Sequence, residues 1–316
     1  MTKNIAVIGC GYWGKNLVRN FSEVGALACI CDPDPIQADK ISSEYGTKCL
    51  PFEDILEDKS IQGIVLAVPA PLHASLAIKA LNKGKHVFVE KPLALCGEEA
   101  KNMIKASEEN NVHLMVGHLL HYHPAFEKLK EVSLSGKLGE LKYIHSNRKS
   151  FGKVRNHEDV IWSFAPHDIS MVLSLSKKEP FKIHADSTSI LQEDIADIGS
   201  IHLAFDSGLE ARICVSWLHP YKEHKLIVIG DSGMLVFDDT QPWQQKLLYL
   251  NYNSELNGAS PLIDKSEMEY LQIEEKEPLR NECLHFLDVV NGKSSPITDG
   301  YEGLKVLKVL LGATSS

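Results

Sequence analysis

The first third of the chain alternates short apolar runs with segments whose apolar residues recur every three or four positions. The apolar runs lie at 4–8, 27–31, 63–68, 87–89 and 112–117. Continuous runs of this length indicate strands that are buried on both faces, and the segments between them indicate helices. Strands that alternate with helices predict a parallel, doubly wound sheet.

From residue 141 onward, strand patterns with a period of two dominate. Apolar and polar residues alternate at 201–205 and 209–217 around the turn 206–208, and a second such pair joins 226–229 to 234–237. This alternation predicts antiparallel hairpins with one buried face, which a helix layer or a second copy of the chain would cover. Helical patterns close the chain at 279–290 and 303–311.

A chain of 316 residues is long enough for two hydrophobic cores. We therefore expect an α/β protein with two domains. Residues 1–118 form a doubly wound parallel sheet, and residues 119–316 form an α/β domain with a large, mostly antiparallel sheet for substrate binding and oligomerisation. A homodimer or homotetramer is the expected assembly.

Charge and composition exclude several classes of partner. The net charge of -9 and pI near 5.9 argue against nucleic acid and anionic membranes. No apolar run approaches the length of a membrane span, and the N-terminus shows no signal-peptide pattern. The seven cysteines have neither disulfide-framework nor zinc spacing, so we expect reduced thiols in a cytoplasmic protein.

The run 4–8 leads directly into Gly9-Cys10-Gly11-Tyr12-Trp13-Gly14 and then into a helical pattern. In a strand–turn–helix unit that binds a dinucleotide, the first glycine allows the tight turn, the second allows the pyrophosphate to approach, and the third packs helix on strand. Asp32 ends the second strand, where a carboxylate accepts hydrogen bonds from ribose hydroxyls and repels a 2′-phosphate. The pattern predicts a Rossmann domain that binds NAD rather than NADP.

Two further strand ends carry polar residues at the edge where ligands of such sheets bind. The run 87–89 ends at Glu90-Lys91-Pro92, and Pro92 fixes the backbone after a lysine that could act as an acid or base if it is desolvated. The run 63–68 ends at Pro69, followed by Leu72 and His73. His73 is either a cofactor contact or a structural, capping histidine.

Three histidines lie close together at positions 118, 121 and 123, beside Tyr122. A metal site would need further ligands, but no Cys, Asp or Glu joins them at ligand spacing. We expect no metal here and interpret these residues as polar groups that line a cleft.

The glycine motif, Asp32, Glu90-Lys91-Pro92 and His167-Asp168 together resemble the Gfo/Idh/MocA oxidoreductases over the whole chain. The resemblance implies a Rossmann domain, a second domain on a large antiparallel sheet, and NAD-dependent dehydrogenation of a sugar or cyclitol hydroxyl. It also implies that Lys91 and His167 line the reacting carbinol. The family usually carries an aspartate four residues before that histidine, where this chain has Ser163, which leaves Lys91 and His167 as the catalytic pair.

Four stretches, 11–16, 146–148, 152–155 and 162–168, are similar to the subgroup that oxidises the sugar 3-hydroxyl of UDP-N-acetylglucosamine-type nucleotides. This resemblance implies that a pyridoxal-phosphate aminotransferase consumes the 3-keto product, giving a 3-amino sugar for lipid A or surface polysaccharide. The expected cofactor-binding residues are Gly9, Gly11, Tyr12, Trp13, Gly14, Asp32, Pro69, Leu72, His73, Glu90, Lys91 and Trp162. The expected substrate-binding residues are Lys91, His118, Tyr122, Asn147, Arg148, Lys153, Arg155 and His167.

Rival hypotheses differ in what the basic residues do and in whether chemistry occurs. A dehydrogenase of a cyclitol or free sugar, of the inositol type, would use Arg148, Lys153 and Arg155 only structurally, as a solvated strand face. A regulatory NAD(H) sensor would need neither Lys91 nor His167. A reductase that uses NADPH would not place Asp32 at the ribose.

Overall fold

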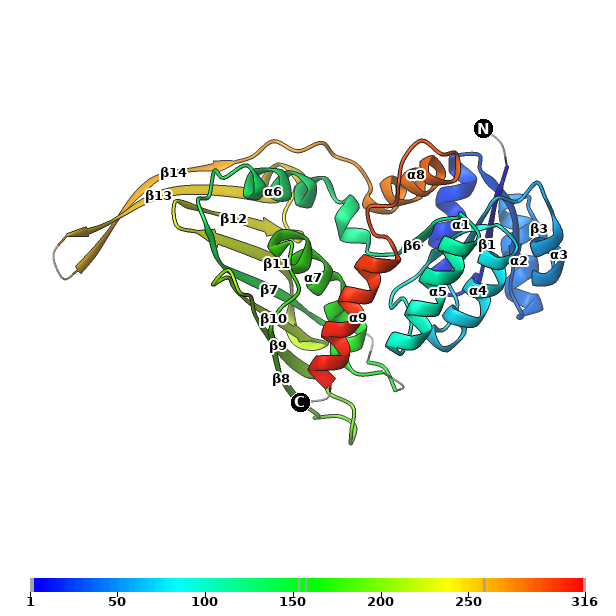
Figure 1. Ribbon diagram of the computed structural model, residues 1–316, viewed down its shortest axis with the longest axis horizontal. Helices are drawn as coiled ribbons and strands as arrows, with labels where there is room; N and C mark the ends of the chain where they lie inside the picture. Colours follow the sequence, from blue (N-terminus) through cyan, green and yellow to red (C-terminus); the bar gives the residue numbers. More distant parts are fainter. Residues whose placement is uncertain (1–2, 153, 157, 258–259, 315–316) are drawn as a thin grey trace. The chain divides into compact units, whose positions relative to one another are not determined.

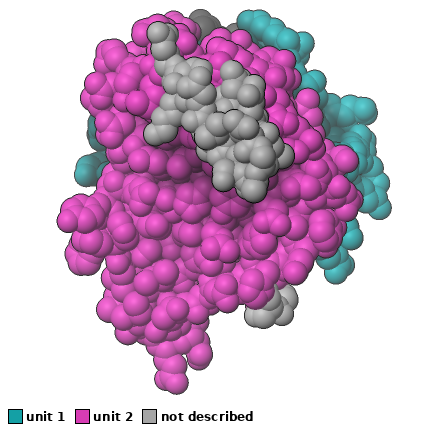
Figure 2. Space-filling model, turned by 90° about the vertical axis from the view of Figure 1, so that its left-hand side faces the viewer, with its two compact units in different colours: residues 1–119, 277–307 teal, residues 120–276, 308–316 magenta. Residues whose placement is uncertain are grey.

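The computed structural model describes residues 3–152, 154–156, 158–257 and 260–314. The chain forms two compact units, Met1–Leu119 with Glu277–Leu307, and Leu120–Lys276 with Lys308–Ser316 (Figure 2). The sequence predicts continuous domains with a boundary after residue 118, whereas the first unit also takes in a segment from the end of the chain.

The first unit is built on a six-stranded sheet with the order β3-β2-β1-β4-β5-β6, in which all neighbouring strands are parallel. The strands are β1 Ile5–Ile8, β2 Leu27–Cys31, β3 Lys48–Cys49, β4 Gly63–Leu66, β5 His86–Val89 and β6 Leu114–Val116. The strand order reverses beside β1, and ligands of doubly wound sheets bind outside the carboxyl ends at that point. The predicted Rossmann sheet is confirmed.

Helices follow the strands as the periodicity predicts. They are α1 Gly14–Glu23, α2 Pro35–Tyr45, α3 Phe52–Glu57, α4 His73–Asn82 and α5 Gly97–Glu109, with a 3-10 turn, η1 Ala70–Leu72, before α4. Helix α2 shows how local sequence sets a boundary. The side chain of Asp34 caps its first turn, Pro35 occupies the first helical position, and Gly46 ends it in the left-handed conformation.

The C-terminal segment completes the core of this first unit. Helix α8 Pro278–Val290 places the Phe286 ring 5.6 Å from that of Phe88 and 6.3 Å from that of Phe21. A Cβ on Gly63 would lie 3.1 Å from the Phe286 ring, so the missing side chain makes room for α8. Helix α9 Gly300–Thr314 follows, and its first residue, Gly300, packs against Ile104 of α5.

The second unit is built on an eight-stranded sheet with the order β14-β13-β12-β11-β7-β10-β9-β8. Its strands are β7 Leu141–Phe151, β8 Lys182–Thr188, β9 Ile198–Ala204, β10 Glu210–Ser216, β11 Leu218–Gly230, β12 Gly233–Asp238, β13 Leu247–Asn257 and β14 Ser260–Tyr270. Within the described residues of this second sheet, only the β7–β10 pair is parallel. The large, mostly antiparallel sheet and both predicted hairpins, β9–β10 and β11–β12, are confirmed.

Helices cover one face of this sheet. Helix α6 Pro124–Leu134 contacts β12, and α7 Val160–Ser176 contacts β7, β9 and β10 (Figure 1). Ile201, Leu203 and Ile213 are fully buried on the covered face, while His202 and Arg212 alternate with them and are more exposed. Short 3-10 turns lie at η2 Leu119–Tyr122 and η3 Trp243–Gln245. Among the helices in the described part of the chain, none is long and apolar enough to cross a membrane.

Candidate functional site

Two of the three motif glycines are required by close backbone packing. Gly9 has a φ of 89°, and a Cβ there would lie 2.5 Å from the carbonyl oxygen of Ala67. A Cβ on Gly14 would lie 1.9 Å from the carbonyl oxygen of Gly9. No other residue fits either position, so the turn from β1 into α1 has the tight geometry of a dinucleotide-binding loop.

Gly11 differs from these two because its surroundings are open. No heavy atom lies within 4 Å of where its Cβ would stand, and the residue is exposed. The N-cap of α1, Trp13, makes no side-chain capping bond, and the first turn of the helix has no acidic residue. The positive end of the helix dipole, with no acidic side chain beside it, therefore favours an anion at this point, as the pyrophosphate of a dinucleotide requires.

Asp32 is held at the end of β2 by backbone donors. Its Oδ2 accepts a hydrogen bond from Cys10 N at 2.6 Å, and its Oδ1 accepts one from Asp34 N at 2.9 Å. A carboxylate has about four lone-pair positions, so each oxygen can still accept a bond from a ribose hydroxyl. The residues present therefore fit the adenosine half of NAD.

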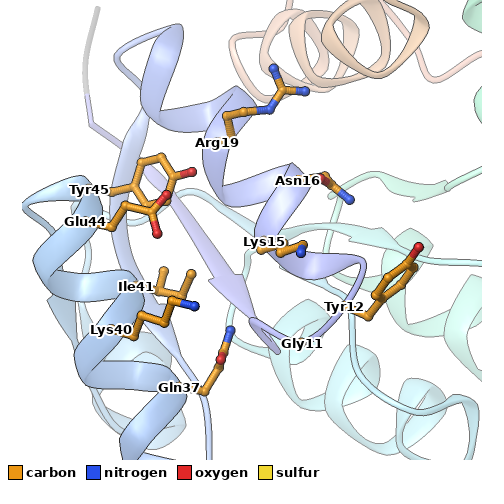
Figure 3. Close-up of a pocket in the computed structure, with 10 residues that line it drawn as sticks. All are labelled: Gly11, Tyr12, Lys15, Asn16, Arg19, Gln37, Lys40, Ile41, Glu44 and Tyr45. Carbon is orange, nitrogen blue, oxygen red and sulfur yellow. The ribbon is translucent and has the colours of Figure 1, made fainter.

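An open groove of about 470 Å³ begins at the glycine turn and runs between α1 and α2 (Figure 3). Gly11 and Tyr12 lie at one end of it, and Lys15 and Lys40 approach it from the two helices. Because the groove is open and carries these cations, solvent and anions reach the backbone of Gly11.

Glu90 connects the glycine turn to the predicted catalytic lysine. Its Oε1 accepts a hydrogen bond from Trp13 Nε1 at 2.5 Å, and its Oε2 accepts one from Lys91 N at 3.3 Å. A Cβ on Gly117 would lie 3.0 Å from that same Oε2, so the glycine after β6 makes room for the carboxylate. Burial raises the pKa of Glu90 to about 7. The hydrogen bond from Trp13 and the charges of Lys91 and His118 lower this pKa, but burial has the larger effect.

His73 holds the chain directly after Lys91. Its Nδ1 lies 2.7 Å from the carbonyl oxygen of Pro92, and its Nε2 lies 2.9 Å from that of Val68. The side chain is 1 % exposed, and burial lowers its pKa. His73 therefore joins the ends of β4 and β5, while Lys91 remains half-buried at the sheet edge.

The three clustered histidines form hydrogen bonds with different parts of the chain. His118 Nδ1 lies 2.6 Å from Glu302 Oε2 in the first unit, whereas His121 Nε2 lies 2.7 Å from Ser170 Oγ in the second. His123 Nδ1 accepts the N–H of Ala125 and so caps α6. The described residues contain no group of three or more potential metal ligands.

Helix α7 positions the residues around His167. The side chain of Asp159 caps its N-terminus by accepting a bond from Trp162 N at 2.9 Å, and burial raises the pKa of this carboxyl. Ser163 is buried one turn before His167, which is half-buried. The sequence analysis missed Asp159, although an aspartate directly before an apolar helical run is a typical N-cap signal.

Arg148 is committed to a partner within its own unit. Its Nε lies 2.5 Å from Asp168 Oδ2, and Ser146 Oγ donates to Asp168 Oδ1 at 2.6 Å. The Arg148 side chain is only 13 % exposed, so it forms neither a solvated strand face nor an open cation. Arg155 is more exposed and pairs with Glu158 at 3.1 Å.

The remaining predicted residues differ in burial and in their partners. Asn147 donates its amide to Glu223 Oε1 at 2.7 Å, and Tyr122 is buried at 2 % exposure. Pro69 and Leu72 are exposed at the 3-10 turn after β4, and Lys153 lies outside the described residues. The predicted cofactor residues other than Trp162 thus lie in the first unit, and the described substrate residues other than Lys91 and His118 lie in the second.

Comparison with known proteins covers both units. The model of an "Oxidoreductase family, NAD-binding Rossmann fold" matches residues 3–118, and that of a "GFO/IDH/MocA C-terminal domain" matches residues 126–236. The chain is 24 % identical to the UDP-N-acetylglucosamine 3-dehydrogenase of Acidithiobacillus ferrooxidans, over 96 % of this chain and 94 % of that protein. It is 26 % identical to the scyllo-inositol 2-dehydrogenase (NAD(+)) of Bacillus subtilis, over 98 % and 93 %.

Solved structures share the fold over nearly the full length. The Acidithiobacillus ferrooxidans UDP-N-acetylglucosamine 3-dehydrogenase superposes with a TM-score of 0.85 at 22 % identity, covering 98 % of this chain and 96 % of that one. The WlbA dehydrogenase from Bordetella pertussis, solved with NADH and UDP-GlcNAcA, superposes with a TM-score of 0.80 at 21 % identity, covering 100 % and 96 %.

Proposed function

The chain belongs to the Gfo/Idh/MocA oxidoreductases, and we propose that within this family it oxidises the sugar 3-hydroxyl of a UDP-N-acetylglucosamine-type nucleotide to the 3-keto sugar. The observation that carries the proposal is the match to a UDP-N-acetylglucosamine 3-dehydrogenase over 96 % of the chain. This match includes both units, as does that to the scyllo-inositol 2-dehydrogenase.

The cofactor is NAD, which accepts the hydride from the carbinol carbon. Gly11 and the N-terminus of α1 would hold its pyrophosphate, and Asp32 would accept bonds from its adenosine ribose. These groups would hold the cofactor along the carboxyl edge of the parallel sheet, and Lys91 follows β5 at that edge.

Hydride leaves the carbinol carbon only as the hydroxyl proton is removed, so the site needs a base within hydrogen-bond reach. Lys91 and His167 share this work in the proposed mechanism. Lys91 is half-buried and follows Glu90, while His167 is an imidazole whose ordinary pKa suits proton transfer at neutral pH. Lys91 belongs to the first unit and His167 to the second.

A nucleotide-sugar substrate carries a diphosphate that needs cations. Arg155, half-buried and paired with Glu158 near the surface, is the described residue best suited to this role. Arg148 is less suited because Asp168 already binds its guanidinium. Arg148 would instead hold α7, and with it His167, against β7.

A 3-keto sugar is reactive toward amines, so a pyridoxal-phosphate aminotransferase is the proposed next enzyme, leading to a 3-amino sugar of lipid A or surface polysaccharide. We further propose that the protein works in the cytoplasm. A second copy of the chain would cover the sheet face of the second unit that α6 and α7 leave open, giving a homodimer or homotetramer.

An inositol-type dehydrogenase is the second candidate. The Bacillus scyllo-inositol 2-dehydrogenase is 26 % identical over 98 % of this chain, and the engagement of Arg148 by Asp168 removes one of the cations that a diphosphate would use. A cyclitol would need the same Lys91 and His167 but no diphosphate contact.

A substrate panel distinguishes these functions. The purified protein is mixed with NAD and UDP-N-acetylglucosamine, UDP-N-acetylglucosaminuronate or myo-inositol, with an aminotransferase and glutamate to remove the ketone, and NADH absorbance is followed. NADH formed with UDP-N-acetylglucosamine alone supports the proposal, and NADH formed only with the inositol selects the second candidate. Silence with every sugar despite tight NAD binding would favour a regulatory sensor.

A further inference from the structure

A second carboxyl is buried in the same unit as Glu90. Glu282 of α8 is 1 % exposed, and within the described residues neither of its carboxyl oxygens has a hydrogen-bond partner. A buried carboxylate without a partner destabilises a fold strongly, and a hydrophobic residue of similar size would not. Packing alone therefore does not explain an acid at this position.

The Glu90 carboxyl lies beside the part of α8 that carries Glu282. A Cβ on Gly117 would stand 3.0 Å from both Glu90 Oε2 and the Phe88 ring, and that ring lies 5.6 Å from Phe286, one turn after Glu282. Burial and the charge of Glu90 raise the pKa of Glu282 well above its ordinary value. Burial also raises the pKa of Glu90. Two like charges close together in a buried site cannot both form near neutral pH, so the two carboxyls titrate as a pair that carries at most one negative charge.

The groups that face this pair come from four elements. Trp13 donates to Glu90 from the glycine turn, and Lys91 follows Glu90 on its own strand. His118, bound to Glu302, lies close enough after β6 to lower the pKa of Glu90. From α8, Cys283 is the other titratable neighbour, and burial together with both carboxylates raises its pKa.

Glu90 directly follows β5, at the carboxyl edge of the sheet along which the cofactor would bind. NAD⁺ and NADH have the same pyrophosphate, but only the oxidised nicotinamide ring carries a positive charge. If the nicotinamide ring binds at this edge, its positive charge would favour the ionised form of a nearby carboxyl pair, and the neutral reduced ring would not.

We propose that Glu90 and Glu282 share one proton, which leaves the protein when NAD⁺ binds and stays when NADH binds. The proton passes to solvent, and no bond of the cofactor is made or broken. The inference rests on the NAD cofactor and not on the identity of the sugar, so a failure of the proposed substrate would leave it unaffected.

Calorimetric titration of the protein with NAD⁺ and with NADH, each in phosphate and in Tris buffer at pH 7, measures the protons released. We expect NAD⁺ to release roughly half a proton more than NADH, because a group with a pKa near 7 is half protonated at that pH. The variant Glu90→Gln/Glu282→Gln should release equal numbers with both cofactors. Cys283→Ala, on the same turn of α8, is the matched control and should behave as the wild type.

Three results would overturn the proposal. One is equal proton release by NAD⁺ and NADH in the wild type, which needs no variant. Another is a wild-type difference that persists in the double variant, which would assign the proton to Lys91 or a histidine. The third concerns Glu282 alone: Glu90→Gln should move the linked ionisation to another pH, so its loss at every pH from 6 to 9 would exclude Glu282.

Discussion

Glu90 makes the stability of the first unit depend on pH. The pKa of this carboxyl is about 7 in the folded protein against an ordinary 4.5, because burial disfavours its charged form. The folded state therefore holds its proton more tightly than the unfolded state does. The contribution of Glu90 to the free energy of unfolding is therefore highest below pH 4.5 and falls as the pH rises to about 7. This fall amounts to about 3 kcal/mol.

Glu282 extends that loss to higher pH, because its pKa is raised further. Urea denaturation at pH 5 and pH 8 should show the wild type losing stability with rising pH. Between these two pH values Glu282→Gln should lose less stability than the wild type, so the difference between the two proteins should shift in favour of the variant at pH 8. Parallel pH profiles for the two proteins would show that Glu282 ionises normally in the fold.

Replacing Lys91 tests the chemistry at the end of β5. Lys91→Ala should lower kcat by about a hundredfold or more, since a positioned base contributes that much. Lys83→Ala is the control, because Lys83 lies exposed at the end of α4 and pairs with Glu57. Retention of more than a tenth of wild-type turnover by Lys91→Ala would remove its catalytic assignment.

Single residues could be assigned from sequence where the backbone nearby dictates their role. Gly9, Gly14 and Asp32 follow from one strand–turn–helix unit, and the structure gives each the geometry that the motif requires. Arg148 could not be assigned, because its partner Asp168 comes from a helix further along the chain. Glu282 gave no signal, since a lone acid in a helical pattern reads as an exposed residue.

At the scale of elements, one substitution in the glycine turn distinguishes its effect on NAD binding from its effect on stability. Gly11→Ala should leave the melting temperature of the cofactor-free protein unchanged, because no atom lies within 4 Å of the new Cβ. The same methyl should weaken NAD binding at least tenfold, since it stands where the pyrophosphate approaches. Calorimetry of NAD binding and a thermal melt measure the two effects.

Gly97→Ala provides the control for this prediction, because Gly97 at the start of α5 also has an open environment and lies far along the chain from the turn. It should change neither quantity. Unchanged NAD affinity in Gly11→Ala would mean that the pyrophosphate does not pass over this residue.

The different pairings of Arg148 and Arg155 predict opposite outcomes when each arginine is replaced. Arg148→Ala leaves the buried Asp168 carboxylate without its cation and should lower the free energy of unfolding by about 3–5 kcal/mol. Arg155→Ala breaks only a surface pair and should leave stability within about 1 kcal/mol while raising the KM for a UDP-sugar. Denaturation and steady-state kinetics measure both, and an unchanged KM in Arg155→Ala would end the diphosphate role.

Helices and strands with a regular pattern of apolar residues could be predicted from the sequence, and short or polar strands could not. The buried strands of the first sheet and both hairpins of the second follow directly from the apolar pattern. Strand β3 has only two residues, both exposed, and β8 is mostly exposed, so neither produces a hydrophobic signal. Such strands form because a neighbouring strand offers them hydrogen bonds, which no local pattern records.

At the scale of the whole molecule, the chain returns to its first unit after building the second. Phe286 of α8 packs on Phe21 and Phe88, which lie in the N-terminal third of the sequence. The helical pattern at 279–290 predicted a helix with an apolar face but not the sheet that this face would cover. An amphipathic pattern specifies that a face is buried, and the packing partner is decided by shape complementarity across the fold.

The transfer of hydride from the sugar C3 position is the measurement that tests the central claim most directly. UDP-N-acetylglucosamine carrying deuterium at C3 is incubated with the protein and NAD, and the cofactor is analysed by mass spectrometry. The account predicts NADH one mass unit heavier, slower formation from the labelled sugar, and loss of both in Lys91→Ala. Unlabelled NADH from this substrate would show that oxidation occurs elsewhere on the molecule and would contradict the proposed 3-dehydrogenase.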